Sequence, residues 1–273
     1  MSSEWRIFFP CIQTENSEAN EAYDSLFAYF ADASSTEERE DNYLISRPYF
    51  GIKHRALKKL ELKVREKTLN KESELAGIEN WTKTKLGKKE PSHYKMEILE
   101  ILASSQGTSA SGDDDSIISN PRFLNLSKIR RRKFAELVVE ICFITFDDPN
   151  IDRNGNSEPT KCSWASVCVE GAQEESLLAG VKTIFGPCHP LWKLIGYLLQ
   201  TSLQSSIDFI SQQKVSPLVG GYPTFVAAVC GNLNHAEFEK NVSRLFYLIE
   251  NFTEKDLTSF EELRATVFPG EKK

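Results

Sequence analysis

Apolar and polar residues alternate with a period of two along several short segments in the first two-thirds of the chain. The clearest case is 59–67, where Leu60, Leu62 and Val64 alternate with charged residues. A period of two places one face of a strand against a core and leaves the other face polar. With β-favouring side chains as a second criterion, the pattern predicts strands at 4–11, 42–46, 49–55, 59–67, 126–133, 137–146 and 162–170.

Helical spacing dominates elsewhere. Tyr23, Leu26, Phe27 and Phe30 follow the i, i+3, i+4, i+7 pattern and predict a helix over 15–30. Further helices are predicted at 92–103, 172–185, 190–213, 222–229, 235–252 and 254–267. The Ser/Gly/Asp-rich stretch 104–119 and the Asp/Asn/Gly/Pro-rich stretch 147–161 predict loops. The charged stretch 68–91 is too weakly periodic to predict any element.

Strands come first along the chain and helices gather later. This order predicts an α+β fold, with an antiparallel, closed sheet of about eight strands and flanking and C-terminal helices. We expect one domain over 1–273, in which 1–185 supplies most strands and 186–273 is helical.

Composition narrows the class of protein. No apolar run approaches the roughly 18–20 residues that a membrane helix needs, and the first residues lack the pattern of a secretory signal. The six cysteines form no CxxC pair, which argues against a zinc ribbon or a disulfide framework. We therefore expect a cytoplasmic protein.

The charge is unevenly distributed. The net charge of −6 argues against nucleic acid as the partner of the whole molecule. Residues 1–46 carry ten acids and two bases, whereas 47–89 carry thirteen bases and five acids. Such asymmetry indicates where an anion would bind.

Basic residues share strand faces at two-residue spacing, as Lys53 and Arg55 do, and as Lys63 and Arg65 do. One interpretation is a half-exposed sheet with a solvated charged face. The other is a barrel that encloses these charges around a charged ligand, since a buried unpaired cation costs several kcal/mol. Composition alone leaves both open.

The order of these motifs resembles the CYTH superfamily, the triphosphate tunnel metalloenzymes, and most closely its thiamine-triphosphatase branch. That family carries R-x-R and, eight residues later, the Lys of an E-L-K strand, the spacing that separates Arg55 from Lys63 here. The resemblance extends over 4–185. Its segments are Asp41-Asn42-Tyr43, Lys53-His54-Arg55, Glu61-Leu62-Lys63, Lys128-Ile129-Arg130-Arg131-Arg132, Val139-Glu140-Ile141 and Val167-Cys168-Val169-Glu170.

Two segments depart from the family pattern. The N-terminal ExExK motif of the family corresponds here to Ser2-Ser3-Glu4-Trp5-Arg6, and its later E-x-E to Cys168-Val169-Glu170. Each departure removes one carboxylate from the set that would hold a hard cation through oxygen ligands.

The resemblance implies metal-dependent hydrolysis of an organic triphosphate, such as thiamine triphosphate, or of inorganic tripolyphosphate. It implies Mg²⁺ (or Mn²⁺) as cofactor, held by Glu4, Glu140 and Glu170. Arg55 and Lys63 are the candidate catalytic residues. The phosphates would be bound by Arg6, Lys53, Arg55, Lys63, Arg65, Arg130 and Arg132.

Other functions fit the same residues. A catalytically degenerate relative would bind a phosphorylated ligand or acidic partner without turnover. An interaction protein could be built on the C-terminal helices, with the basic face contacting acidic protein or RNA. The family fold also hosts nucleotide cyclisation. In the leading interpretation the partner is a small polyanion, and a membrane has no role.

Overall fold

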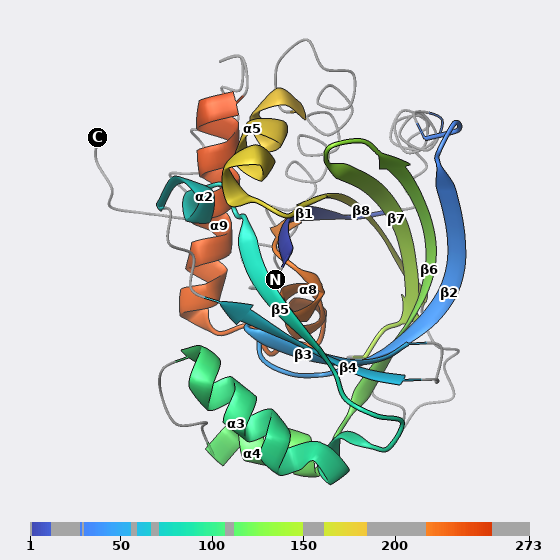
Figure 1. The fold of residues 1–273 in the computed structure, drawn as a ribbon, viewed down its shortest axis with the longest axis vertical. Coiled ribbons are helices and arrows are strands. Elements are labelled where there is room, and N and C mark those ends of the chain that lie inside the picture. The colour runs from blue at the N-terminus through green and yellow to red at the C-terminus, as the bar shows by residue number, and fades with distance from the viewer. Residues whose placement is uncertain are drawn as a thin grey trace.

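The computed structural model describes residues 2–11, 28, 30–55, 59–66, 71–106, 112–149, 161–184 and 217–252. Eight strands form one closed antiparallel sheet, a β-barrel (Figure 1). They are β1 (Ser2–Pro10), β2 (Ser35–Leu44), β3 (Phe50–Arg55), β4 (Lys59–Glu66), β5 (Glu79–Lys85), β6 (Phe123–Phe134), β7 (Val138–Asp147) and β8 (Lys161–Gly171). Their order is β5-β4-β3-β2-β6-β7-β8-β1, and pairing of β1 with β5 closes the barrel. The predicted α+β class and closed antiparallel sheet are confirmed.

Helices cover two parts of the outer surface of the barrel (Figure 1). On one side α2 (Lys71–Leu75), α5 (Glu174–Ile184) and α9 (His235–Phe252) lie together, and α5 packs on the apolar outer faces of β1 and β8. On another side α3 (Lys95–Gln106) and α4 (Gly112–Ser119), with the 3₁₀ turn η1 (Pro91–Tyr94), cover Leu60, Leu62 and Val64 of β4. The apolar residues of these strands therefore point outward, which turns their charged neighbours inward.

One helix lies inside the barrel. Helix α8 (Tyr222–Val229) follows the two-residue strand β9 (Leu218–Val219), which pairs with β1. Its Phe225 ring stacks on Phe8 with ring centroids 4.4 Å apart. Both rings belong to a buried apolar cluster that includes the inward-facing Leu126 and Ile144. This cluster fills one end of the barrel, so the charged residues share the remaining interior.

Several elements differ from the sequence-based prediction. Strand β2 begins at Ser35 and not at 42, and β5 lies in the stretch for which no element was predicted. The loop predicted over 104–119 is wrong for its second half, which forms α4: three aspartates favour the first turn of this helix, and Ile118 buries against the outside of the barrel. The predicted helices 222–229 and 235–252 are confirmed as α8 and α9.

Other predictions fall on parts of the chain that the structure does not describe. These are almost all of the helix 15–30, the helices 190–213 and 254–267, and most of the loop 147–161. Among the helices that are described, none has the length and apolar character required to cross a membrane.

Candidate anion-binding cavity

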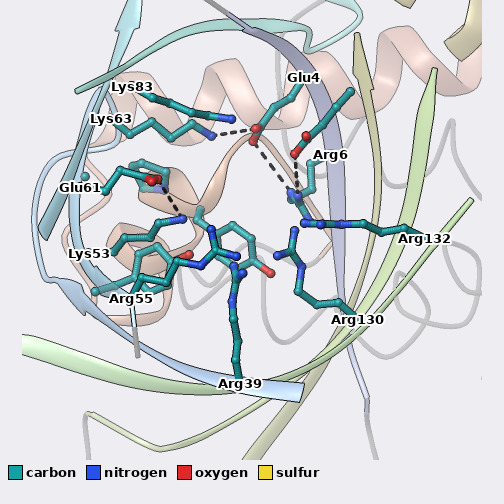
Figure 2. A pocket seen from close by; sticks show the side chains of 15 residues that line it. Glu4, Arg6, Arg39, Lys53, Arg55, Glu61, Lys63, Lys83, Arg130 and Arg132 are labelled. Carbon is teal, nitrogen blue, oxygen red and sulfur yellow. Dashed lines mark hydrogen bonds and ion pairs between the residues drawn. The ribbon is translucent and has the colours of Figure 1, made fainter. Parts of the chain in front are cut away.

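A cavity of about 230 Å³ opens inside the barrel beside α8 (Figure 2). Eight Lys and Arg side chains line it against three Glu, which leaves a formal charge of +5. The lining residues that the sequence predicted as site residues are Glu4, Arg6, Lys53, Arg55, Lys63, Arg130, Arg132 and Glu170. The strands therefore bring together eight of the ten predicted site residues, which are separated by up to 166 positions in the sequence.

Two predicted residues do not line the cavity. Glu140 is buried behind it, with 1% of its side chain exposed. Arg65 lies on the inner face of β4, where it donates to Glu79 at 3.0 Å and to Glu237 of α9 at 3.1 Å. Arg65 therefore links the barrel to a helix. It does not lie at the cavity, where a phosphate-binding role was predicted for it from the sequence.

Seven further lining residues are not among the ten predicted site residues, although Glu61 lies in a segment that carries the family resemblance. They are Arg39, Tyr43, Gly51, Glu61, Lys83, Tyr222 and Pro223. Two of them have a two-residue spacing that places them on a shared strand face. Arg39 shares its face with Glu37 and Asp41, and Lys83 shares its face with Trp81 in β5. For Tyr222 and Pro223 there was no signal, because only the tertiary fold inserts α8 into the barrel.

Strand register places like charges next to each other. Lys63 of β4 pairs in register with Lys83 of β5, and directly opposed like charges destabilise a sheet. Lys63 is compensated by Glu4, with Nζ 2.7 Å from Oε2, and its ammonium lies 4.3 Å from the centroid of the Trp81 ring. Lys83 forms no hydrogen bond or ion pair with any residue that the structure describes. Lys83 is instead exposed to solvent, and only the charges of Glu4 and Glu61 act on it from a greater distance.

Buried carboxylates hold the arginines in place. Glu140 accepts hydrogen bonds from Arg6 at 3.0 Å, from Arg132 at 2.7 Å and from Arg130. Burial alone would raise the pKa of Glu140, but the charges of Arg6 and the other two guanidinium groups outweigh it and lower the pKa well below the usual range. Glu140 is therefore charged and keeps three arginines oriented.

Glu37 of β2, two strands away from Glu140, provides the same compensation: it accepts hydrogen bonds from Arg39, Arg55 and Arg130. Burial opposes ionisation of Glu37, yet the nearby guanidinium groups lower its pKa to about 2. Lys53 is less well compensated: Glu61 lies 3.0 Å away, but burial still lowers the pKa of Lys53. A bound anion would favour the charged form of this lysine.

The residues predicted to hold a metal ion do not fit one in this arrangement. Arg6 lies between them, with Nη1 3.0 Å from Glu140, Nε 3.9 Å from Glu4 and Nη2 3.9 Å from Glu170. Within the described part of the chain, no three His, Cys, Asp or Glu side chains are grouped so as to hold a metal ion. A cation is thus already present among these carboxylates, in the form of a guanidinium group.

Comparison with known proteins gives little further information. A scan of protein-family models and a search of curated proteins give no match. The fold is similar to the Hippeastrum protein HpAC1, whose structure is described as revealing a dominant triphosphatase activity, with TM-score 0.37, 12% identity, and 68% of this chain and 86% of that chain covered. It is also similar to a conserved hypothetical protein from Pyrococcus furiosus, with TM-score 0.31, 14% identity, and coverages of 66% and 89%. Because both TM-scores are below 0.5, we infer nothing about this chain from either protein.

Proposed function

We propose that the barrel binds a short oligophosphate, either inorganic tripolyphosphate or the triphosphate group of a small organic compound. The observation that carries the proposal is the excess of cations at the cavity, eight Lys and Arg against three Glu. Arginine presents a planar fork that matches phosphate oxygens, and several such groups converge from different strands. Glu37 and Glu140 behind the lining offset part of this charge, and a ligand with several negative charges would compensate the cations that remain in excess.

The size and position of the cavity favour a compact ligand. Its volume of about 230 Å³ is below the roughly 300–1,000 Å³ of pockets for drug-sized molecules. One end of the barrel is filled by α8, with Tyr222 and Pro223 among the lining residues. Such a space suits the phosphate chain itself and leaves an attached organic group near the mouth.

The motif resemblance to triphosphate tunnel metalloenzymes supports the same ligand class. Hydrolysis of the bound anion is a second candidate function, with Arg55 and Lys63 as the predicted catalytic residues. It is favoured by Glu170, a lining carboxylate whose side chain is 30% exposed and which could orient a water molecule as a general base. Dependence on Mg²⁺ or Mn²⁺ stays a prediction, and so does protein binding by the C-terminal helices.

The test is thermal unfolding of the full chain with tripolyphosphate, in EDTA and in Mg²⁺, together with an assay of phosphate release. A ligand at 100 times its dissociation constant stabilises the folded state by about 2.7 kcal/mol, which is readily measured. Monophosphate at matched ionic strength is the control, because it lacks the linked charges. We expect a large shift with tripolyphosphate and a small one with monophosphate.

The outcomes separate the candidates. Stabilisation without phosphate release supports a binding protein, whereas release in addition supports a hydrolase. Equal shifts with both phosphates would indicate a general salt effect. The absence of any shift would contradict the proposal and leave the cavity as a charged interior without a ligand of this class.

A further inference from the structure

Three carboxylates on neighbouring strands face one guanidinium group. In the register of β1 and β8, Glu4 lies opposite Glu170 and Arg6 opposite Cys168. In the register of β7 and β8, Cys168 lies opposite Glu140. The three glutamates therefore surround Arg6 on the inner wall of the barrel, where the sequence predicted a metal ion.

The guanidinium group of Arg6 is held firmly at this position. Only 2% of the side chain is exposed, and Nη1 also donates to Ser166 Oγ at 3.1 Å. Its central carbon lies 4.7 Å from the centroid of the Tyr222 ring, which is a cation–π contact. Arginine does not lose its proton in proteins, so its positive charge persists at every pH at which the fold exists.

One oxygen of each carboxylate points toward Arg6. These are Oε1 of Glu4, Oε1 of Glu140 and Oε1 of Glu170. The second oxygens of Glu4 and Glu140 are bound by other cations, by Lys63 for Glu4 and by Arg130 and Arg132 for Glu140. A divalent cation that used these carboxylates would have to occupy the space that Arg6 fills.

The fit around Arg6 is incomplete in one respect. Oε1 of Glu4 and Nε of Arg6 are both buried and have no hydrogen-bond partner among the described residues, and they lie 3.9 Å apart. A buried carboxylate oxygen without a close partner is costly. Without Arg6, the Oε1 atoms of Glu4, Glu140 and Glu170 would face one space with no guanidinium group between them, and carboxylate oxygens are the ligand type that Mg²⁺ and Mn²⁺ prefer.

We propose that Arg6 takes the place of a divalent cation in this barrel, so that the chain binds its oligophosphate without metal, and that removal of the Arg6 side chain creates a divalent-cation site. The claim of metal-free oligophosphate binding rests on the proposed function. The claim that removal of Arg6 creates a cation site does not. The ligands of the created site are Glu4, Glu140 and Glu170, with water completing the coordination shell.

The experiment measures Mn²⁺ binding by the loss of the free-ion electron paramagnetic resonance signal. It compares wild type, Arg6→Ala and Arg132→Ala in the absence of phosphate. We expect Arg6→Ala to bind Mn²⁺ at least about tenfold more tightly than wild type. Arg132→Ala is the matched control, because it removes a guanidinium from Glu140 but leaves Arg6 between the carboxylates.

Several outcomes would overturn the proposal. They are Mn²⁺ binding by wild type as tight as by Arg6→Ala, equal gains in Arg6→Ala and Arg132→Ala, or no gain in an Arg6→Ala protein whose circular dichroism is native. If Arg6→Ala fails to fold, Arg6→Met preserves the apolar stem and is measured instead. Mn²⁺ binding by wild type is measured whether or not a variant folds, and it tests whether Arg6 keeps a divalent cation out of the barrel.

Tripolyphosphate binding by wild type in EDTA separates this inference from the proposed function. Binding that persists in EDTA and is not tightened by Mn²⁺ supports both. Binding that requires Mn²⁺ would leave the proposed function standing and overturn the inference. If tripolyphosphate binds under neither condition, the proposed function fails, while a gain of Mn²⁺ binding in Arg6→Ala would still support a cation site filled by Arg6.

Discussion

Lys63 and Lys83 face each other across β4 and β5 but differ in their partners. Lys63 contacts Glu4 and the Trp81 ring, whereas Lys83 is exposed and makes no hydrogen bond or ion pair with a described residue. Only the more distant charges of Glu4 and Glu61 act on Lys83, so its ammonium group is the freer of the two to bind an anion. A substitution at Lys83 therefore tests binding with little effect on folding.

We expect Lys83→Ala to weaken tripolyphosphate binding about tenfold, because it removes one charge-assisted hydrogen bond of about 1.5 kcal/mol. The melting temperature without ligand should stay the same or rise slightly, since the opposed charge of Lys63 loses its neighbour. Isothermal titration calorimetry and thermal unfolding measure the two effects. Lys85→Ala is the matched control, because Lys85 is exposed on the same face of β5 as Lys83 but does not line the cavity. Equal losses in both variants would indicate a diffuse charge effect instead of a contact.

Acid should destabilise the protein through carboxylates such as Glu37. Its folded-state pKa of about 2 is below its ordinary value of 4.5. Between these values the unfolded chain binds more protons than the folded chain. This contribution to the free energy of unfolding is therefore complete above pH 4.5 and is lost as the pH falls toward 2. Urea unfolding at several pH values from 5 to 2 should show this decline, and Glu37→Gln should make it shallower. An equally steep decline in Glu37→Gln would contradict the assignment.

At the scale of elements, the sequence predicted strands well where only one face is charged. Strand β4 was readable because Leu60, Leu62 and Val64 point outward to α3 and α4. The first part of β2 was not predicted, because Glu38 and Glu40 are exposed outside while charged residues also fill its inner face. Hydrophobic periodicity cannot detect a strand that is charged on both faces. The same limit explains why Arg39 was missed, whereas Arg130 was found because its segment resembles a family motif.

The contact between α8 and β3 depends on a small residue. A Cβ atom added to Gly51 would lie 2.7 Å from Cγ of Pro223, at the start of α8. Neither group can move without shifting backbone or the ring. Glycine at this position therefore permits α8 to lie against the wall of the barrel, beside the cavity.

We expect Gly51→Ala to destabilise the protein by about 1–3 kcal/mol through overpacking. Because Gly51 and Pro223 both line the cavity, tripolyphosphate affinity should fall as well. Chemical denaturation and calorimetry measure the two effects. Gly112→Ala is the control, since nothing lies within 4 Å of its added Cβ and alanine favours a helix. A neutral Gly51→Ala would mean that α8 is free to adjust, and its role in bounding the cavity would then be in doubt.

At the scale of the whole molecule, two of the strand pairings that close the barrel are short, β1–β5 and β2–β3, with three register pairs each. Strands β1 and β5 pair in register at Ser2–Trp81, Ser3–Asn80 and Glu4–Glu79 only. Other neighbours, such as β6 and β7, pair along most of their length. Cations of the cavity stand on both sides of the β1–β5 seam, with Arg6 on β1 and Lys83 on β5. An anion bound between Arg6 and Lys83 would therefore hold β1 and β5 together.

Hydrogen exchange tests this coupling. Without ligand, we expect the amides of the β1–β5 seam to exchange faster than those of the β6–β7 pair, because short pairings open at a lower free-energy cost. Tripolyphosphate should slow exchange at the seam more strongly than at β6–β7, which serves as the internal reference. Equal slowing in both regions would mean that the ligand stabilises the fold as one unit. Slowing at β6–β7 alone would place the anion against Arg130 and Arg132, away from Lys83, and would contradict a ligand that spans the cavity.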